Sequence, residues 1–169
     1  YAHMCYGGSG GNQNLAEARD YYRRAANQGC AESQHYYALM CDNGIGGPRS
    51  YSRAKAYYKL AADQGCKASQ YSYAQICFEG MESDKNLIEA RKYFKLAADQ
   101  GCVESQSSYA QMCYEGVGGD KDFVEARKIF KNSADQGKSL AKCLYAQMCY
   151  EGMGGDKDLV EAREHYKQA

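Results

Sequence analysis

Two glycine-rich loops are the first candidates for ligand chemistry in this sequence. Residues 116–122 read GVGGDKD and residues 152–158 read GMGGDKD. A phosphate-binding loop would end in Gly-Lys-Ser/Thr, and a calcium loop would alternate acidic ligands and close with a distant glutamate. Neither pattern is present. We therefore interpret these glycines and aspartates as helix stops, turns and caps, and expect no ligand in these loops.

Nine cysteines and three histidines raise the question of a metal site. Zinc ligands come in short clusters such as Cys-x-x-Cys. The cysteines form no such cluster, and neither do His3, His35 and His165. We predict no metal and no cofactor.

The spacing of the cysteines argues against a disulfide framework. One series runs in steps of 36 residues from Cys5 to Cys149, and a second runs from Cys30 to Cys102. Equivalent cysteines on packed parallel helices would lie about 8–10 Å apart, beyond disulfide reach. We interpret most of the cysteines as small buried side chains in a reducing, cytoplasmic compartment. Cys143, outside both series, is predicted to be exposed.

The sequence offers no catalytic constellation. No nucleophile, base and orienting residue recur in positions that a repeat would gather. Asp63, Asp99 and Asp135 recur before Gln-Gly, where solvent-facing turn residues are expected. We predict that the chain is not an enzyme.

Charge and hydropathy exclude two partner classes. Lysine plus arginine equals aspartate plus glutamate, 21 each, so no electrostatic footprint for nucleic acid or an anionic membrane is visible. No apolar run approaches the ~18 residues of a membrane span. We expect a protein or peptide partner, with no nucleic acid and no membrane.

A unit of 36 residues recurs through the chain. Glycines stand at 29, 65, 101 and 137, and alanines at 18, 54, 90, 126 and 162. A fixed period in this range is typical of stacked repeats that each bury one face against a neighbour. We predict a single array over residues 1–169, divided into units 1–29 (partial), 30–65, 66–101, 102–137 and 138–169 (partial).

Each unit is predicted to contain two helices. In residues 67–80, small or apolar residues follow one helical face, and Gly80 ends the helix. Residues 86–101 begin with Asn86 and Glu89, a capping-box pattern in which each side chain satisfies the other's backbone N–H. Ser50 and Arg53 replace this pair in one unit, so a weaker cap is expected there.

These residues resemble the Sel1-like repeats, relatives of the tetratricopeptide repeats. The second half of the unit carries the match, as in Ala90, Tyr93, Phe94, Ala97, Ala98 and Gly101. The first half departs from the family pattern at Tyr73, Ala74 and Cys77. The resemblance implies an all-α fold, a right-handed α/α superhelix of about four and a half helix-turn-helix repeats. It also implies an interaction scaffold or adaptor with no catalytic residues.

By analogy with the tetratricopeptide relatives, the first helix of each unit should line a concave face. Positions opposite the predicted packing face vary between units, as solvent or a partner would allow. We predict that glutamines between aromatic anchors bind a partner segment there. The predicted partner-binding residues are His35, Leu39, Tyr71, Gln75, Phe78, Ser107, Gln111, Tyr114, Leu140, Gln147 and Tyr150.

Alternatives remain open at this point. These side chains could be merely exposed, with some aromatic rings packing on a neighbouring unit. The array could hold subunits of a larger assembly, or regulate or space a catalytic domain such as a kinase or a ubiquitin-ligase subunit. A lumenal quality-control adaptor is a third reading, disfavoured by the cysteine pattern. Neither end carries a polar cap, which suggests a segment of a longer array.

Overall fold

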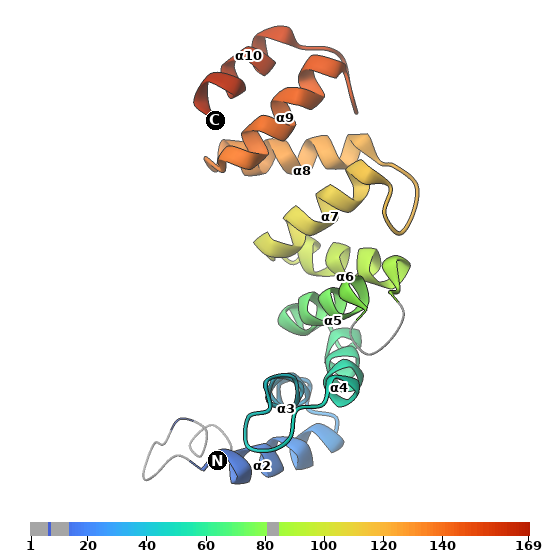
Figure 1. Cartoon of the computed structure of the whole chain (residues 1–169), viewed down its shortest axis with the longest axis vertical. Coiled ribbons are helices and arrows are strands. Elements are labelled where there is room, and N and C mark those ends of the chain that lie inside the picture. The colour runs from blue at the N-terminus through green and yellow to red at the C-terminus, as the bar shows by residue number, and fades with distance from the viewer. Residues whose placement is uncertain (1–6, 8–13, 81–84) are drawn as a thin grey trace.

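The computed structural model describes residue 7 and residues 14–80 and 85–169, and within these residues the fold is all-α (Figure 1). No strand occurs in the described part of the chain. The helices are α2 (Leu15–Asn27), α3 (Ala31–Asn43), α4 (Tyr51–Asp63), α5 (Lys67–Glu79), α6 (Leu87–Asp99), α7 (Val103–Glu115), α8 (Phe123–Asp135), α9 (Ser139–Glu151) and α10 (Leu159–Gln168).

The helices form a superhelical row in which each one packs mainly on the helices before and after it in the chain. In each repeat an odd-numbered helix comes first, and the even-numbered helix that follows it packs against it. The row is curved, and α2 and α10 lie on the same side of its middle (Figure 1). The predicted all-α superhelix is confirmed.

Left-handed glycines end the first helix of each repeat, as predicted. The C-caps Gly44, Gly80, Gly116 and Gly152 have φ between 69° and 76°. A residue with a Cβ is strained in this region, whereas glycine is not. The chain can therefore turn sharply into the loop that leads to the second helix.

The N-caps of the second helices form one of the two hydrogen bonds that the capping-box pattern predicts. The side chain of Asn86 accepts a hydrogen bond of 3.1 Å from the backbone N–H of Glu89. The corresponding bond at Ser50 is longer, 3.4 Å, in line with the weaker cap expected there. The reciprocal bond to the cap's own N–H is absent, because the N–H of Asn86 donates to the carbonyl of Cys77. The Glu89 carboxylate instead accepts from the hydroxyl of Tyr73, at 2.8 Å.

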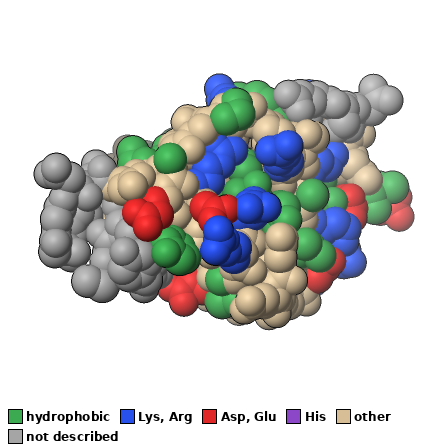
Figure 2. All heavy atoms as spheres, turned by 90° about the horizontal axis from the view of Figure 1, so that it is seen from below, with side chains coloured by type: hydrophobic (Ala, Val, Ile, Leu, Met, Phe, Trp, Pro, Cys, Tyr) green, Lys and Arg blue, Asp and Glu red, His purple; other side chains and the backbone are tan. Residues whose placement is uncertain are grey.

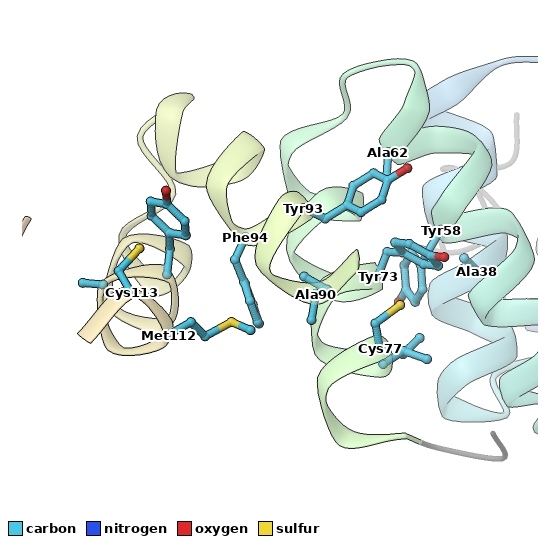
Figure 3. Packing of buried hydrophobic residues seen from close by; sticks show 14 of the residues in the cluster. Ala38, Tyr58, Ala62, Tyr73, Cys77, Ala90, Tyr93, Phe94, Met112 and Cys113 are labelled. Atoms are coloured by element: carbon cyan, nitrogen blue, oxygen red, sulfur yellow. The ribbon is translucent and has the colours of Figure 1, made fainter. Parts of the chain in front are cut away.

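Small and aromatic side chains alternate in the core, as the period predicts. Figure 3 shows Tyr73, Cys77 and Ala90 gathered between the two helices of one repeat. Ala90 and its counterparts are almost fully buried, which lets the helix axes approach closely. Tyr166 departs from the pattern, because it is 50% exposed where its counterpart Phe130 is 4% exposed.

The glycine-rich loops pack against the preceding repeat. The loop residue Gly118 has a φ of 70°, and a Cβ there would lie 2.1 Å from the carbonyl oxygen of Leu87. At the next position, a Cβ on Gly119 would lie 2.8 Å from Nη1 of Arg91. The two glycines therefore leave room for the first turn of α6 and for its arginine. Packing between repeats accounts for this loop sequence without any ligand.

The cysteines divide into two groups. Members of the first series, such as Cys77, are fully buried in the described repeats, as predicted. The prediction is wrong for the second series, because Cys30 is exposed and Cys66 and Cys102 are half-buried. These three residues are the N-caps of first helices, where the chain turns at the surface between repeats. Cys143 is exposed, as expected.

Candidate functional site

An apolar groove of about 630 Å³ lies across the first helices of three consecutive repeats. Helices α5, α7 and α9 provide most of its walls, and α6 contributes a single ring. The lining residues are Gln75, Phe78, Glu79, Phe94, Ser107, Ser108, Gln111, Met112, Glu115, Leu140 and Leu144. Apolar grooves of this size with a few polar groups are the usual binding sites on protein surfaces.

The repeat geometry explains why these residues meet. Gln75 and Gln111 occupy equivalent positions 36 residues apart, as do Glu79 and Glu115. Stacked helices with the same sequence phase point equivalent side chains to the same side. A residue type at one position of the unit therefore becomes a row along the groove.

Phe94 and Met112 connect the groove to the core. Each is 2% exposed, and Phe94 extends from α6 toward Met112 of α7 (Figure 3). The ring of Phe78 meets that of Phe94 edge-on, with centroids 6.4 Å apart. Phe78 is 39% exposed and Leu140 is 74% exposed. The groove thus has a packed base, with apolar side chains still open to solvent at its edges.

The polar side chains of the groove are partly engaged with one another. Nε2 of Gln75 donates to the hydroxyl of Tyr71 at 2.9 Å, and Gln111 donates to the carboxylate of Glu115. Ser107 donates to the carbonyl of Val103 one turn back. A bound segment would compete with these local bonds, which favours recognition by apolar contact and charge over amide pairing.

Five successive segments match the sequence profile described as "Sel1 repeat", namely residues 1–30, 31–66, 67–102, 103–138 and 139–169. The chain belongs to the Sel1 repeat family. The predicted resemblance is confirmed. The segments that begin at residues 31, 67, 103 and 139 start at the first residues of α3, α5, α7 and α9.

Solved structures of Sel1 repeat proteins share the fold. A protective antigen of uropathogenic Escherichia coli with an SLR fold is 28% identical, with a TM-score of 0.83 over 99% of this chain and 36% of the antigen. A Sel1 repeat protein from Oxalobacter formigenes is 25% identical, with a TM-score of 0.84 over 99% of this chain and 69% of that protein. Cysteine-rich protein B of Helicobacter pylori, at 19% identity, has a TM-score of 0.55 over 76% of this chain and 92% of its own. This Sel1 chain thus spans about a third of the E. coli antigen. A comparison with curated proteins finds no match.

Part of the predicted partner-binding set lines the groove of the Sel1 array, and the rest lies outside the groove. Residues Gln75, Phe78, Ser107, Gln111 and Leu140 line it. The remaining residues of the set do not line the groove; they are His35, Leu39, Tyr71, Tyr114, Gln147 and Tyr150.

His35 packs between two Sel1 repeats. Its Nδ1 lies 2.8 Å from the hydroxyl of Ser69, and its ring lies 5.7 Å from that of Tyr58. Burial lowers the pKa of His35, because the charged imidazolium would lose solvation there. The equivalent residue of the next repeat is Tyr71. Ser105, the counterpart of Ser69, is buried and has no hydrogen-bond partner among the described residues. His35 therefore has a packing partner in the fold.

The aromatic residues outside the groove also have neighbours. Tyr71 packs on Phe94, and burial raises the pKa of its hydroxyl. Tyr114 lies edge-on to Phe123, with ring centroids 5.7 Å apart. Tyr150 lies in a separate hollow between α9 and α10. The alternative placed some aromatic rings against a neighbouring unit, whereas Tyr71 and Tyr114 pack on the second helix of their own repeat.

Sequence reasoning missed the acidic residues of the groove. Glu79 and Glu115 end α5 and α7, next to the C-cap glycines. The sequence does show a signal for them, because glutamate recurs every 36 residues at Glu79, Glu115 and Glu151. Phe94, which the sequence analysis named only for the family match, forms the floor of the groove.

Other classes of site find little support in the described part of the Sel1 chain. No three His, Cys, Asp or Glu side chains within it are placed to hold a metal ion. None of its helices is long and apolar enough to cross a bilayer. Basic and acidic side chains are interspersed over the face drawn in Figure 2.

Proposed function

We propose that this Sel1 array is a non-enzymatic scaffold that binds a segment of a partner protein in the groove across α5, α7 and α9. Sel1 repeat proteins in general mediate interactions between proteins, and the family is typically non-catalytic. The observation that carries the proposal is the open apolar groove, with Leu140 and Phe78 exposed at its edges. Exposed apolar side chains around a concave surface are the usual anchors of a protein interface.

The cysteine chemistry supports a cytoplasmic location for the scaffold. The described cysteines carry free thiols, and four of them are buried among core side chains. Free thiols persist in a reducing compartment and are lost in an oxidising one. Trapping thiols in intact cells before lysis tests the location: we expect reduced cysteines, and a largely oxidised protein would contradict it.

The proposed groove is tested by affinity capture with matched variants. The groove variant carries Phe78→Ser and Leu140→Ser, and the control carries Ile88→Ser and Val124→Ser. Ile88 and Val124 lie on second helices and are 75% and 68% exposed, so the control also removes exposed apolar surface. Circular dichroism first shows that all three proteins are folded.

We expect the groove variant alone to lose its partner. Loss in the control variant alone would move the interface to the second helices. Equal capture by all three proteins would contradict binding in the groove.

A further inference from the structure

The charges that line the groove are all of one sign. Among the described residues, Glu79 and Glu115 are the only ionisable side chains that line it, and no lysine or arginine of this part of the chain is among the lining residues. Neither carboxylate takes part in an ion pair within the described residues. The groove therefore presents two carboxylates without a basic partner beside an apolar floor.

The backbone adds to this negative charge. The carbonyl end of a helix carries a partial negative charge, which is usually balanced by a basic residue in the last turn. Helices α5, α7 and α9 have no basic residue in their last turns. Instead each of them ends in a glutamate, Glu79, Glu115 or Glu151. The three first helices thus direct their negative ends and their carboxylates to the same side of the array.

Lysines at equivalent repeat positions, Lys85, Lys121 and Lys157, follow the ends of these three helices. The ammonium group of Lys85 lies 5.9 Å from the ring centre of Phe78, a cation–π contact. At the opposite end of the same helices, Lys67 and Lys138 lie close enough to Glu104 to lower the pKa of that carboxyl, although hydrogen bonds to Glu104 contribute more. The side chains of Lys121 and Lys157 lie against the C-cap glycines Gly116 and Gly152, just past the ends of α7 and α9. Neither lysine lines the groove, so its described lining carries carboxylates as its only charged groups.

We propose that the groove takes a partner segment in which an apolar side chain is accompanied by lysine or arginine. This inference rests on the proposed function and specifies its partner. The apolar side chain would pack among Phe78, Leu140 and Leu144, above Phe94. The basic side chain would reach Glu79 or Glu115, neither of which has an ion-pair partner within the described residues. An acidic segment or a nucleic acid backbone would be repelled from the same position.

A peptide-display selection tests the partner chemistry directly. A library of random linear peptides is selected on the wild-type array after depletion on the Phe78→Ser, Leu140→Ser variant. We expect the enriched peptides to carry lysine or arginine within a few residues of a large apolar side chain. Enriched peptides that are acidic or uncharged would overturn the inference.

A second experiment tests whether the carboxylates of Glu79 and Glu115 bind the basic side chain of the peptide. An enriched peptide is bound to the wild type and to a Glu79→Gln, Glu115→Gln variant, with anisotropy as the readout. Both glutamates are exposed, so the amides keep the fold. We expect the variant to bind about five- to tenfold more weakly and to lose most of the salt dependence.

The outcomes separate the two proposals. Loss of binding on the Phe78→Ser, Leu140→Ser variant with unchanged binding on the glutamine variant would overturn the basic partner but leave the groove in place. A selection that enriches no peptide for the wild type after the depletion step would overturn the groove itself.

Discussion

Arg91 of α6 donates a hydrogen bond of 2.8 Å to the carbonyl oxygen of Asp120, in the loop of the following repeat. Its second guanidinium nitrogen lies 3.4 Å from the sulfur of Cys113. Arg127 repeats the arrangement with Asp156, and Arg19 with Pro48. The same three junctions have Gly-Gly in the loop, whereas the junction with Lys55 in place of arginine has Glu-Ser. Arginine and the glycine pair thus form one packing unit between repeats.

Removing this arginine should weaken the array. We expect Arg91→Ala to lower the free energy of unfolding by about 2 kcal/mol, since it leaves loop carbonyls without a charged donor. Arg163 is the matched control, because it occupies the same repeat position in α10 and is exposed. Urea denaturation followed by circular dichroism measures both. Equal effects of Arg91→Ala and Arg163→Ala would show that the loop contact contributes nothing.

Two glycines with the same backbone conformation should differ in their tolerance of a side chain. Gly118 and Gly101 have φ of 70° and 77°, but only Gly118 has backbone atoms within contact distance of a Cβ. Gly101→Ala should cost about 1 kcal/mol for the left-handed conformation alone. Gly118→Ala should cost clearly more, because the loop must move away from Leu87. Thermal unfolding of the two variants checks the order, and a smaller loss for Gly118→Ala would contradict the packing.

The half-buried His35 predicts a dependence of stability on pH. The pKa of His35 in the folded state is below its ordinary value of 6.5, and the main cause is burial. As the pH falls below about 6.5, the unfolded chain binds the proton first, so stability present at neutral pH is lost. We expect the urea midpoint to drop more between pH 7.5 and 5.5 for the wild type than for His35→Gln. The same drop in both proteins would assign the effect to other groups.

Thiol reactivity should follow the two groups of cysteines. Hydrogen bonds from Ser33 lower the pKa of the exposed Cys30, which increases its thiolate fraction. Burial raises the pKa of Cys77. With N-ethylmaleimide at neutral pH and peptide mapping by mass spectrometry, Cys30 should be labelled well before Cys77. Labelling of Cys77 at a similar rate would contradict its burial.

Much of the fold follows from the sequence, because the repeat places equivalent residues in equivalent environments. The helix within residues 67–80 and its stop at Gly80 were both predictable from spacing and glycine alone. The capping box was only half predictable, since the partner of the Asn86 N–H, the Cys77 carbonyl, belongs to the preceding helix. Helical phase predicted which side of the first helices faces away from the packing, but it could not reveal that Tyr71 packs on Phe94 of the next helix in the same repeat. Such contacts depend on how helices cross, which the period does not specify.

Site-specific photo-cross-linking tests the central claim most directly. A benzophenone side chain at position 140 lies at the groove, and one at position 88 lies on a second helix with the same exposure, 74% against 75%. In cells that express the array, we predict a partner adduct from position 140 and none from position 88. Adducts from position 88 alone, or from both positions equally, would contradict binding of the partner in the groove.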